Sequence, residues 1–185
     1  MSPNIPMPKT ANGNLLEIIA LCKKIIPEQK PVYLEIEPAE GSVVNECYEN
    51  VARVIKQKGG SIQYGWQIWE TMPDVMAEAE FHSVWKDVDG HYHDVTPKEM
   101  QGITRILFLP DSSKIYSGRQ IDNVRIALKD DPLIYDFIKN AESYFEATNR
   151  GKLADYHGEL VATPEMEKLM RQNAEISLAI IQKFY

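Results

Sequence analysis

Cysteine is scarce in this sequence and positive charge is nowhere concentrated, and each shortage excludes a class of protein. Cys22 and Cys47 are the two cysteines among 185 residues, too few for a disulfide framework and without the Cys-x-x-Cys spacing of many metal sites. We therefore expect two free thiols, no metal and no cofactor. The formal charge is −7 and no run of Lys or Arg stands out, which argues against nucleic acid as a partner.

Long apolar runs are also lacking. No stretch approaches the roughly 20 apolar residues of a membrane-spanning helix, and the first residues have neither the basic start nor the apolar run of a secretory signal. We therefore expect a cytoplasmic protein that does not contact a membrane. The 44% apolar and 25% charged residues are typical of a packed chain, and the length suits a single domain spanning residues 1–185.

Apolar periodicity predicts an α+β fold with helices at both ends of the chain. Residues 1–13 contain three prolines and are expected to form a loose arm. Residues 14–115 should form the core, including an N-terminal helix. Residues 116–185 should form a C-terminal helical extension, in which Asp131-Pro132 and Thr163-Pro164 each mark the start of a helix.

The core is predicted to contain two helices and a central antiparallel sheet. The first helix begins with Asn14 as its cap, and the second runs from about Asn45 to Lys58, where Gly59-Gly60 ends it. Alternating apolar residues predict strands between residues 62 and 109. We expect the Cys-bearing second helix to pack on this sheet, with the N- and C-terminal helices flanking it.

Cys47 falls in the first turn of the second predicted helix. A helix N-terminus stabilises an anion through its unpaired N–H groups and its dipole, so a thiol there is favoured as the reactive thiolate. The same N–H groups could hold the oxyanion that forms when a thiolate attacks a carbonyl, with Asn45 donating one more hydrogen bond. The alternative is that Cys47 is a small core residue on the inner face of the helix, beside Val51 and Val54.

His82 and Asp94 lie on two strands that are predicted to form a hairpin, and its register decides whether they meet. A three-residue loop over Val88-Asp89-Gly90 puts Asp94 opposite Val84 and diagonal to His82, and a loop centred on Val88 puts Asp94 directly across from His82. A two-residue Asp89-Gly90 turn instead moves Asp94 to the other face. A His–Asp contact is what a cysteine nucleophile needs, because the imidazole takes the thiol proton and the carboxylate orients the ring.

Three sequence blocks around these residues resemble one superfamily. The block Asn45-Glu-Cys-Tyr-Glu-Asn-Val51 resembles its Cys helix. Ala79-Glu-Phe-His-Ser-Val-Trp85 resembles its His strand, and Asp94-Val-Thr-Pro97 resembles its Asp strand, in the same order along the chain. The superfamily is that of transglutaminase-like and papain-like cysteine enzymes, and the blocks also resemble an uncharacterised bacterial branch of it. The resemblance covers roughly residues 40 to 110. It implies a papain-like core with Cys47 as nucleophile, His82 as general base and Asp94 as orienting carboxylate.

The function expected from these residues is cleavage or transfer of an amide through a thioester. The amide would belong to a peptide, an isopeptide or a glutamine side chain, so the partner would be a peptide or protein substrate. Glu80 shares a strand face with His82, and Trp66 lies on the preceding strand, so both are candidates for substrate contact.

Two other functions remain open. The first is a papain-like fold without catalytic activity that serves as a binding or assembly module, with the terminal helices forming a homodimer surface. The second, weaker, is a metal site built on His82, His91 and His93, because two imidazoles two residues apart on a strand can face one ion.

Overall fold

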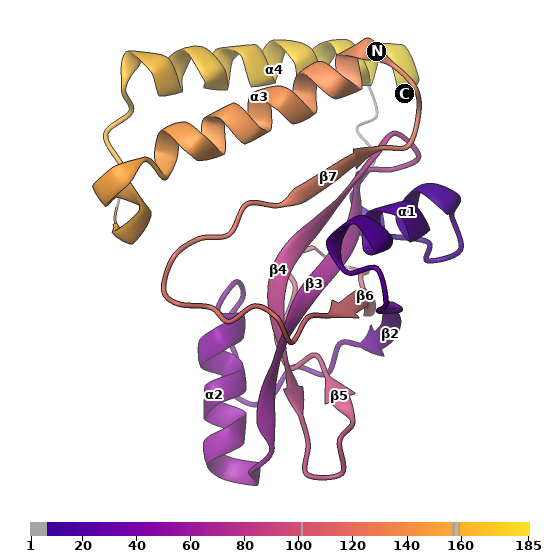
Figure 1. Ribbon diagram of the computed structural model, residues 1–185, viewed down its shortest axis with the longest axis vertical. Helices are drawn as coiled ribbons and strands as arrows, with labels where there is room; N and C mark the ends of the chain where they lie inside the picture. Colours follow the sequence, from indigo (N-terminus) through magenta and orange to yellow (C-terminus); the bar gives the residue numbers. More distant parts are fainter. Residues whose placement is uncertain (1–6, 101, 157, 159) are drawn as a thin grey trace.

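Within the residues that the structure describes, the fold is α+β, with four α-helices around a seven-stranded antiparallel sheet (Figure 1). It is seen in a computed structural model that describes residues 7–100, 102–156, 158 and 160–185. The sheet has the strand order β2-β6-β3-β4-β5, with β1 paired to β3 and β7 paired to β4. None of the helices within the described residues has the length and apolar character needed to cross a membrane.

A long hairpin forms the centre of the sheet. Its strands are β3 (Ser61–Met72) and β4 (Met76–Lys86), and β3 also pairs with β6 (Arg105–Pro110). Gly65 allows β6 to approach closely, because a Cβ there would lie 2.4 Å from the carbonyl oxygen of Leu109. Strand β2 (Val32–Glu35) completes the sheet on the far side of β6.

Helix α1 (Leu16–Ile25) packs its apolar stripe on the hairpin and β6. The chain before it is not a loose arm throughout, because β1 (Lys9–Thr10) pairs with β3; the first six residues of the predicted arm lie outside the described residues. Asn14 is not the helix cap either. The side chain of Asn12 accepts a hydrogen bond from the Asn14 N–H, which makes a turn, and the helix starts only after Leu15.

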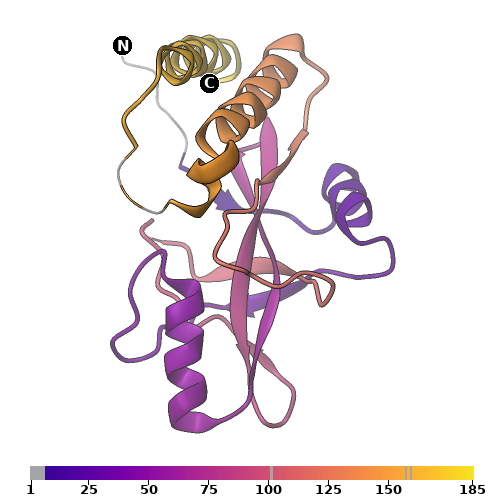
Figure 2. The same ribbon diagram turned by 60° about the vertical axis from the view of Figure 1, so that its left-hand side comes forward.

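Helix α2 (Cys47–Lys58) packs against β4, as expected for the Cys-bearing helix. Its Val51 and Val54 join the buried cluster that includes Val95. Helices α1 and α2 lie on opposite sides of the β3–β4 hairpin in both views (Figures 1 and 2). Gly59, at the end of α2, takes the positive φ angle that a chain reversal requires.

The C-terminal segment is not wholly helical, because it contains β7 (Val124–Ala127), which pairs with the start of β4. Helix α3 (Pro132–Thr148), the short 3₁₀ helix η1 (Gly151–Asp155) and helix α4 (Pro164–Phe184) follow it. Both predicted helix starts are confirmed: Asp131 accepts a hydrogen bond from the Leu133 N–H, and Thr163 from that of Met166. Together α3 and α4 form a layer across one end of the hairpin (Figure 2).

The second hairpin, between β4 and β5 (Tyr92–His93), has the first of the three registers considered. Trp85 pairs with His93, so Asp94 falls opposite Val84 and diagonal to His82. The three-residue loop ends at Gly90, whose φ of 92° gives the left-handed turn. His82 and Asp94 therefore share a face.

Candidate active site

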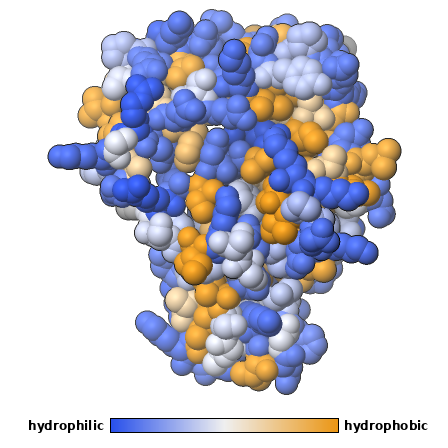
Figure 3. Space-filling model, in the orientation of Figure 1, coloured by the Kyte–Doolittle hydropathy of each residue, from blue (hydrophilic) through white to orange (hydrophobic). Residues whose placement is uncertain are grey.

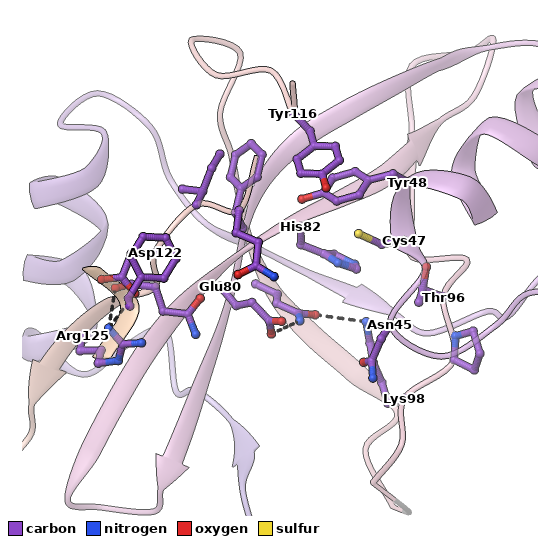
Figure 4. A pocket seen from close by; sticks show the side chains of 17 residues that line it. Asn45, Cys47, Tyr48, Glu80, His82, Thr96, Lys98, Tyr116, Asp122 and Arg125 are labelled. Atoms are coloured by element: carbon purple, nitrogen blue, oxygen red, sulfur yellow. Dashed lines mark hydrogen bonds and ion pairs between the residues drawn. The ribbon is translucent and has the colours of Figure 1, made fainter. Parts of the chain in front are cut away.

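The site lies at an interruption in the pairing of β4. Strand β7 pairs with residues 76–79 of β4, and β5 pairs with residues 85 and 86. The N-terminus of α2 meets the stretch between them, where Cys47 contacts Ser83 and His82. The sheet edge thus brings a helix N-terminus and a strand histidine together (Figure 4).

Cys47, His82 and Asp94 come together as the sequence predicts. The His82 Nε2 atom lies 3.2 Å from Asp94 Oδ1, and the ring also bonds with the Cys47 thiol. Asp94 is fully buried, and its Oδ1 accepts a further hydrogen bond from the Thr96 N–H at 3.2 Å. The imidazole therefore stands between sulfur and carboxylate, each of which bonds to it.

Asn50 ties the Cys helix to the Asp94 turn. Its side chain accepts a hydrogen bond from the Val43 N–H at 3.0 Å and donates to the Val43 carbonyl at 2.7 Å, which fixes the loop before the helix. Its amide nitrogen also lies 3.3 Å from Thr96 Oγ1. In the same loop Asn45 takes a φ of 66°, a left-handed conformation that turns the chain into α2. These bonds hold the Cys47 loop and the Asp94 turn in fixed relative positions.

The pKa values of the three groups favour an ion pair of thiolate and imidazolium. Burial raises the pKa of Cys47, but hydrogen bonding to His82, its positive charge and bonds with Ser83 together bring that pKa below its ordinary value. Burial lowers the pKa of His82, but the charge of Asp94 together with hydrogen bonds to Asp94 and Cys47 raises that pKa to about 9. Cys22, buried among apolar residues of the core, shows the opposite shift: burial raises its pKa to about 11.

A chain of polar side chains continues from Asp94 across the sheet. The Lys98 ammonium lies 2.8 Å from Asp94 Oδ2 and donates to Gln67 Oε1 at 3.1 Å. The Gln67 amide in turn donates to Glu80 Oε2 at 2.5 Å. Burial raises the pKa of Asp94, but the charges of His82 and Lys98 bring it below its ordinary value. Asp94 is therefore an anion held between two cations.

A pocket of about 420 Å³ opens beside Cys47. Asn45, the predicted oxyanion donor, and Glu80, a predicted substrate contact, both line it. The ring of Tyr116 stacks on Tyr48 with centroids 3.9 Å apart, over the thiol (Figure 4). Cys47 is only 7% exposed, and both tyrosines line the pocket beside it.

Trp66 does not line the pocket, contrary to the expectation that it contacts substrate. It pairs with Phe81, one residue from His82, so its side chain points to the opposite face of the sheet. There it is buried in the core, and its indole N–H donates to Asp111 Oδ2 at 3.1 Å.

The three histidines of the metal hypothesis do not converge. His82 faces Cys47, whereas His93 pairs with Trp85 on the other face and bonds to Asp87 at 2.9 Å. His91 lies 3.5 Å from the same carboxylate. Across the described residues, no group of three or more His, Cys, Asp or Glu side chains has an arrangement that could hold a metal ion.

Comparison with known proteins found no matching family model, no matching curated protein and no matching solved structure.

Proposed function

We propose that this protein is a cysteine-dependent hydrolase or acyl transferase that acts on an amide bond of a peptide or protein. The proposal includes a core of the papain-like or transglutaminase-like kind, which the order of the Cys helix, the His strand and the Asp strand supports. One observation carries it: a thiol of lowered pKa bonds to an imidazole of raised pKa, which a buried carboxylate orients.

The first half of the reaction forms a thioester. The Cys47 sulfur attacks the carbonyl carbon, and the carbonyl oxygen takes up the electron pair as an oxyanion. N–H groups in the first turn of α2, for which no side chain serves as cap, and the Asn45 amide stabilise that charge. The His82 imidazolium then donates its proton to the leaving nitrogen, and the carbon–nitrogen bond breaks.

The second half releases the acyl group. Neutral His82 removes a proton from water or from an acceptor amine, which attacks the thioester carbon. The carbon–sulfur bond breaks, the thiolate re-forms and His82 is again an imidazolium. Asp94 keeps its negative charge throughout, because its role is to orient the ring and stabilise its charged form.

A second candidate is a binding or assembly module with the same core but no catalytic activity. The observation in its favour is the 7% exposure of Cys47 beneath Tyr48 and Tyr116. A homodimer through the terminal helices belongs to this candidate and remains a prediction.

Alkylation of the native protein at pH 6 separates the two. With a pKa of about 11, Cys22 has a thiolate fraction of about 10⁻⁵ at this pH. It therefore serves as the internal control for a buried thiol that is not activated. We expect iodoacetamide to modify Cys47 far faster than Cys22 and faster than an unstructured cysteine peptide, as read by peptide mass mapping. p-Nitrophenyl acetate should then leave an acetyl group on Cys47.

Three variants test the cause of this reactivity. His82→Ala should return Cys47 to the rate of an ordinary buried thiol, and Asp94→Asn should reduce its rate less. His93→Ala removes a histidine from the opposite face and should leave the rate unchanged. Circular dichroism checks that each variant is folded. Slow labelling of Cys47 in the native protein, or labelling that His82→Ala does not alter, would contradict the enzymatic proposal.

A further inference from the structure

A second groove adjoins the pocket that holds Cys47. It measures about 470 Å³ and lies between α3, α4 and the chain that leads into β7. Gln120, Arg125 and Phe145 line both the groove and the pocket, so the two adjoin one another at these side chains. Any substrate that extends past Phe145 from a carbonyl at Cys47 enters this groove.

The groove has apolar side chains on α3 and α4 and amide groups around them. Phe145 and Tyr144 come from α3, and Leu169 and Met170 come from α4; the amides are those of Gln120 and Asn173. Met170 is 52% exposed, so a ligand can cover apolar surface that is now open to water. The two helices that line the groove are joined by a hydrogen bond, because the buried Asn140 on α3 donates to the Leu169 carbonyl at 3.0 Å.

The cation at the junction between groove and pocket is paired. Arg125 lies 3.2 Å from Glu78 and 3.0 Å from Asp122, so its positive charge is offset there by two carboxylates. The guanidinium is therefore not open to an anionic ligand, and a neutral chain does not compete with its ion pairs. An apolar surface with amide groups around it suits a polypeptide, which combines apolar side chains with a backbone that needs hydrogen-bond partners.

We infer that this groove binds an apolar side chain of an extended polypeptide substrate whose reacting carbonyl lies at Cys47. The inference rests on the proposed function and adds to it a substrate class and a specificity site supplied by the C-terminal helices. On the face shown in Figure 3, apolar side chains are dispersed among polar ones rather than gathered in one broad patch.

Electrophilic peptides of simple composition test this inference. We would use tetrapeptides of Ser and Gly with a chloroacetyl group at the N-terminus or a vinyl sulfone at the C-terminus, and move a single Leu along each. The rate of Cys47 modification should rise about tenfold when Leu occupies one particular position, as expected for an apolar side chain in an apolar site. The same peptides with Ser at that position give the reference rate.

Two variants on α4 locate the effect. Met170→Glu should reduce the Leu preference to within about twofold, because it places a charge in the groove. Leu178→Glu is the matched control: Leu178 is 51% exposed on the same helix but does not line the groove, so this variant should keep the preference. Both variants should react normally with iodoacetamide.

The outcomes separate this inference from the proposed function. If iodoacetamide modifies wild-type Cys47 slowly, the proposed function fails and this inference fails with it. If iodoacetamide reacts fast but no Leu position is preferred, or Met170→Glu and Leu178→Glu behave alike, only the groove assignment is overturned. A dimer in sedimentation that Met170→Glu dissociates would also overturn it, because the groove would then bind a second copy of the chain.

Discussion

Replacing Lys98 with Met tests how the protein tolerates a fully buried Asp94. The side chain of Lys98 is 10% exposed, and its ammonium lies 2.8 Å from Asp94 Oδ2. At an effective dielectric constant of about 20, two charges at this distance attract with about 6 kcal/mol, and burial of the ions offsets much of that. The variant leaves Asp94 with His82 as its remaining cation.

The expected loss of stability follows from that remaining partner. Breaking a buried ion pair typically costs about 3–5 kcal/mol, and His82 keeps the loss near the lower limit, at about 3 kcal/mol. For a chain of this length the melting temperature should fall by about 6–12 °C, measured by calorimetry. Arg150→Met is the control, because its ion pair with Glu165 is exposed on both sides and should contribute almost nothing.

The same variant should shift the titration of His82. The positive charge of Lys98 lowers the pKa of His82, so its removal should raise that pKa above its present value of about 9. Histidine resonances in an NMR titration report it directly. A His82 pKa that falls in Lys98→Met, or a stability loss no larger than that of Arg150→Met, would refute the reasoning.

Two further predictions concern pH and access. The pKa of His82 rises from 6.5 to about 9 on folding, so the contribution of its protonated form to stability should be complete below pH 6.5 and disappear as the pH rises through about 9. Urea unfolding below pH 6.5 and above pH 9 measures this loss of stability, and His82→Gln, which lacks the titrating group, is the control. Tyr116→Ala should speed modification of Cys47 by a bulky maleimide more than by iodoacetamide, whereas Tyr135→Ala, an exposed tyrosine on α3, should change neither rate. Equal acceleration for both reagents would contradict a role for Tyr116 in limiting access.

Local sequence patterns predict the three central side chains because each depends on nearby chain geometry. The position of Cys47 in the first turn of α2 follows from helical periodicity and the Gly59-Gly60 stop. The shared face of His82 and Asp94 follows from strand alternation and a loop of only three residues. Such features do not depend on distant parts of the chain.

The rest of the site depends on long-range pairing that a single sequence does not reveal. Strand β7 has four residues, and only its pairing with β4 makes it a strand, so the sequence alone places it within the predicted helical extension of residues 116–185. The expectation that Trp66 contacts substrate is wrong. The β3–β4 pairing shifts register between Trp69 and Met72, so counting residues from the turn does not reveal that Gly65, rather than Trp66, pairs with His82. Lys98 lies four residues after Asp94 in a segment that is neither helix nor strand. Sequence periodicity therefore does not indicate that the Lys98 side chain reaches the Asp94 carboxylate.

The buried polar groups around Cys47 argue that it is more than a small core residue. His82, Asp94, Thr96 and Asn50 are all buried beside it, and hydrogen bonds link His82 to Asp94, Asp94 to Thr96 and Thr96 to Asn50. A core cysteine needs none of them, as Cys22 shows within the same fold: it packs among apolar residues and its pKa is raised to about 11. Burying a charged triad costs several kcal/mol per ion unless every partner is in place. A chain that folds around such a group, at a gap in its own sheet and at the end of a helix, retains the features that a thiolate nucleophile requires.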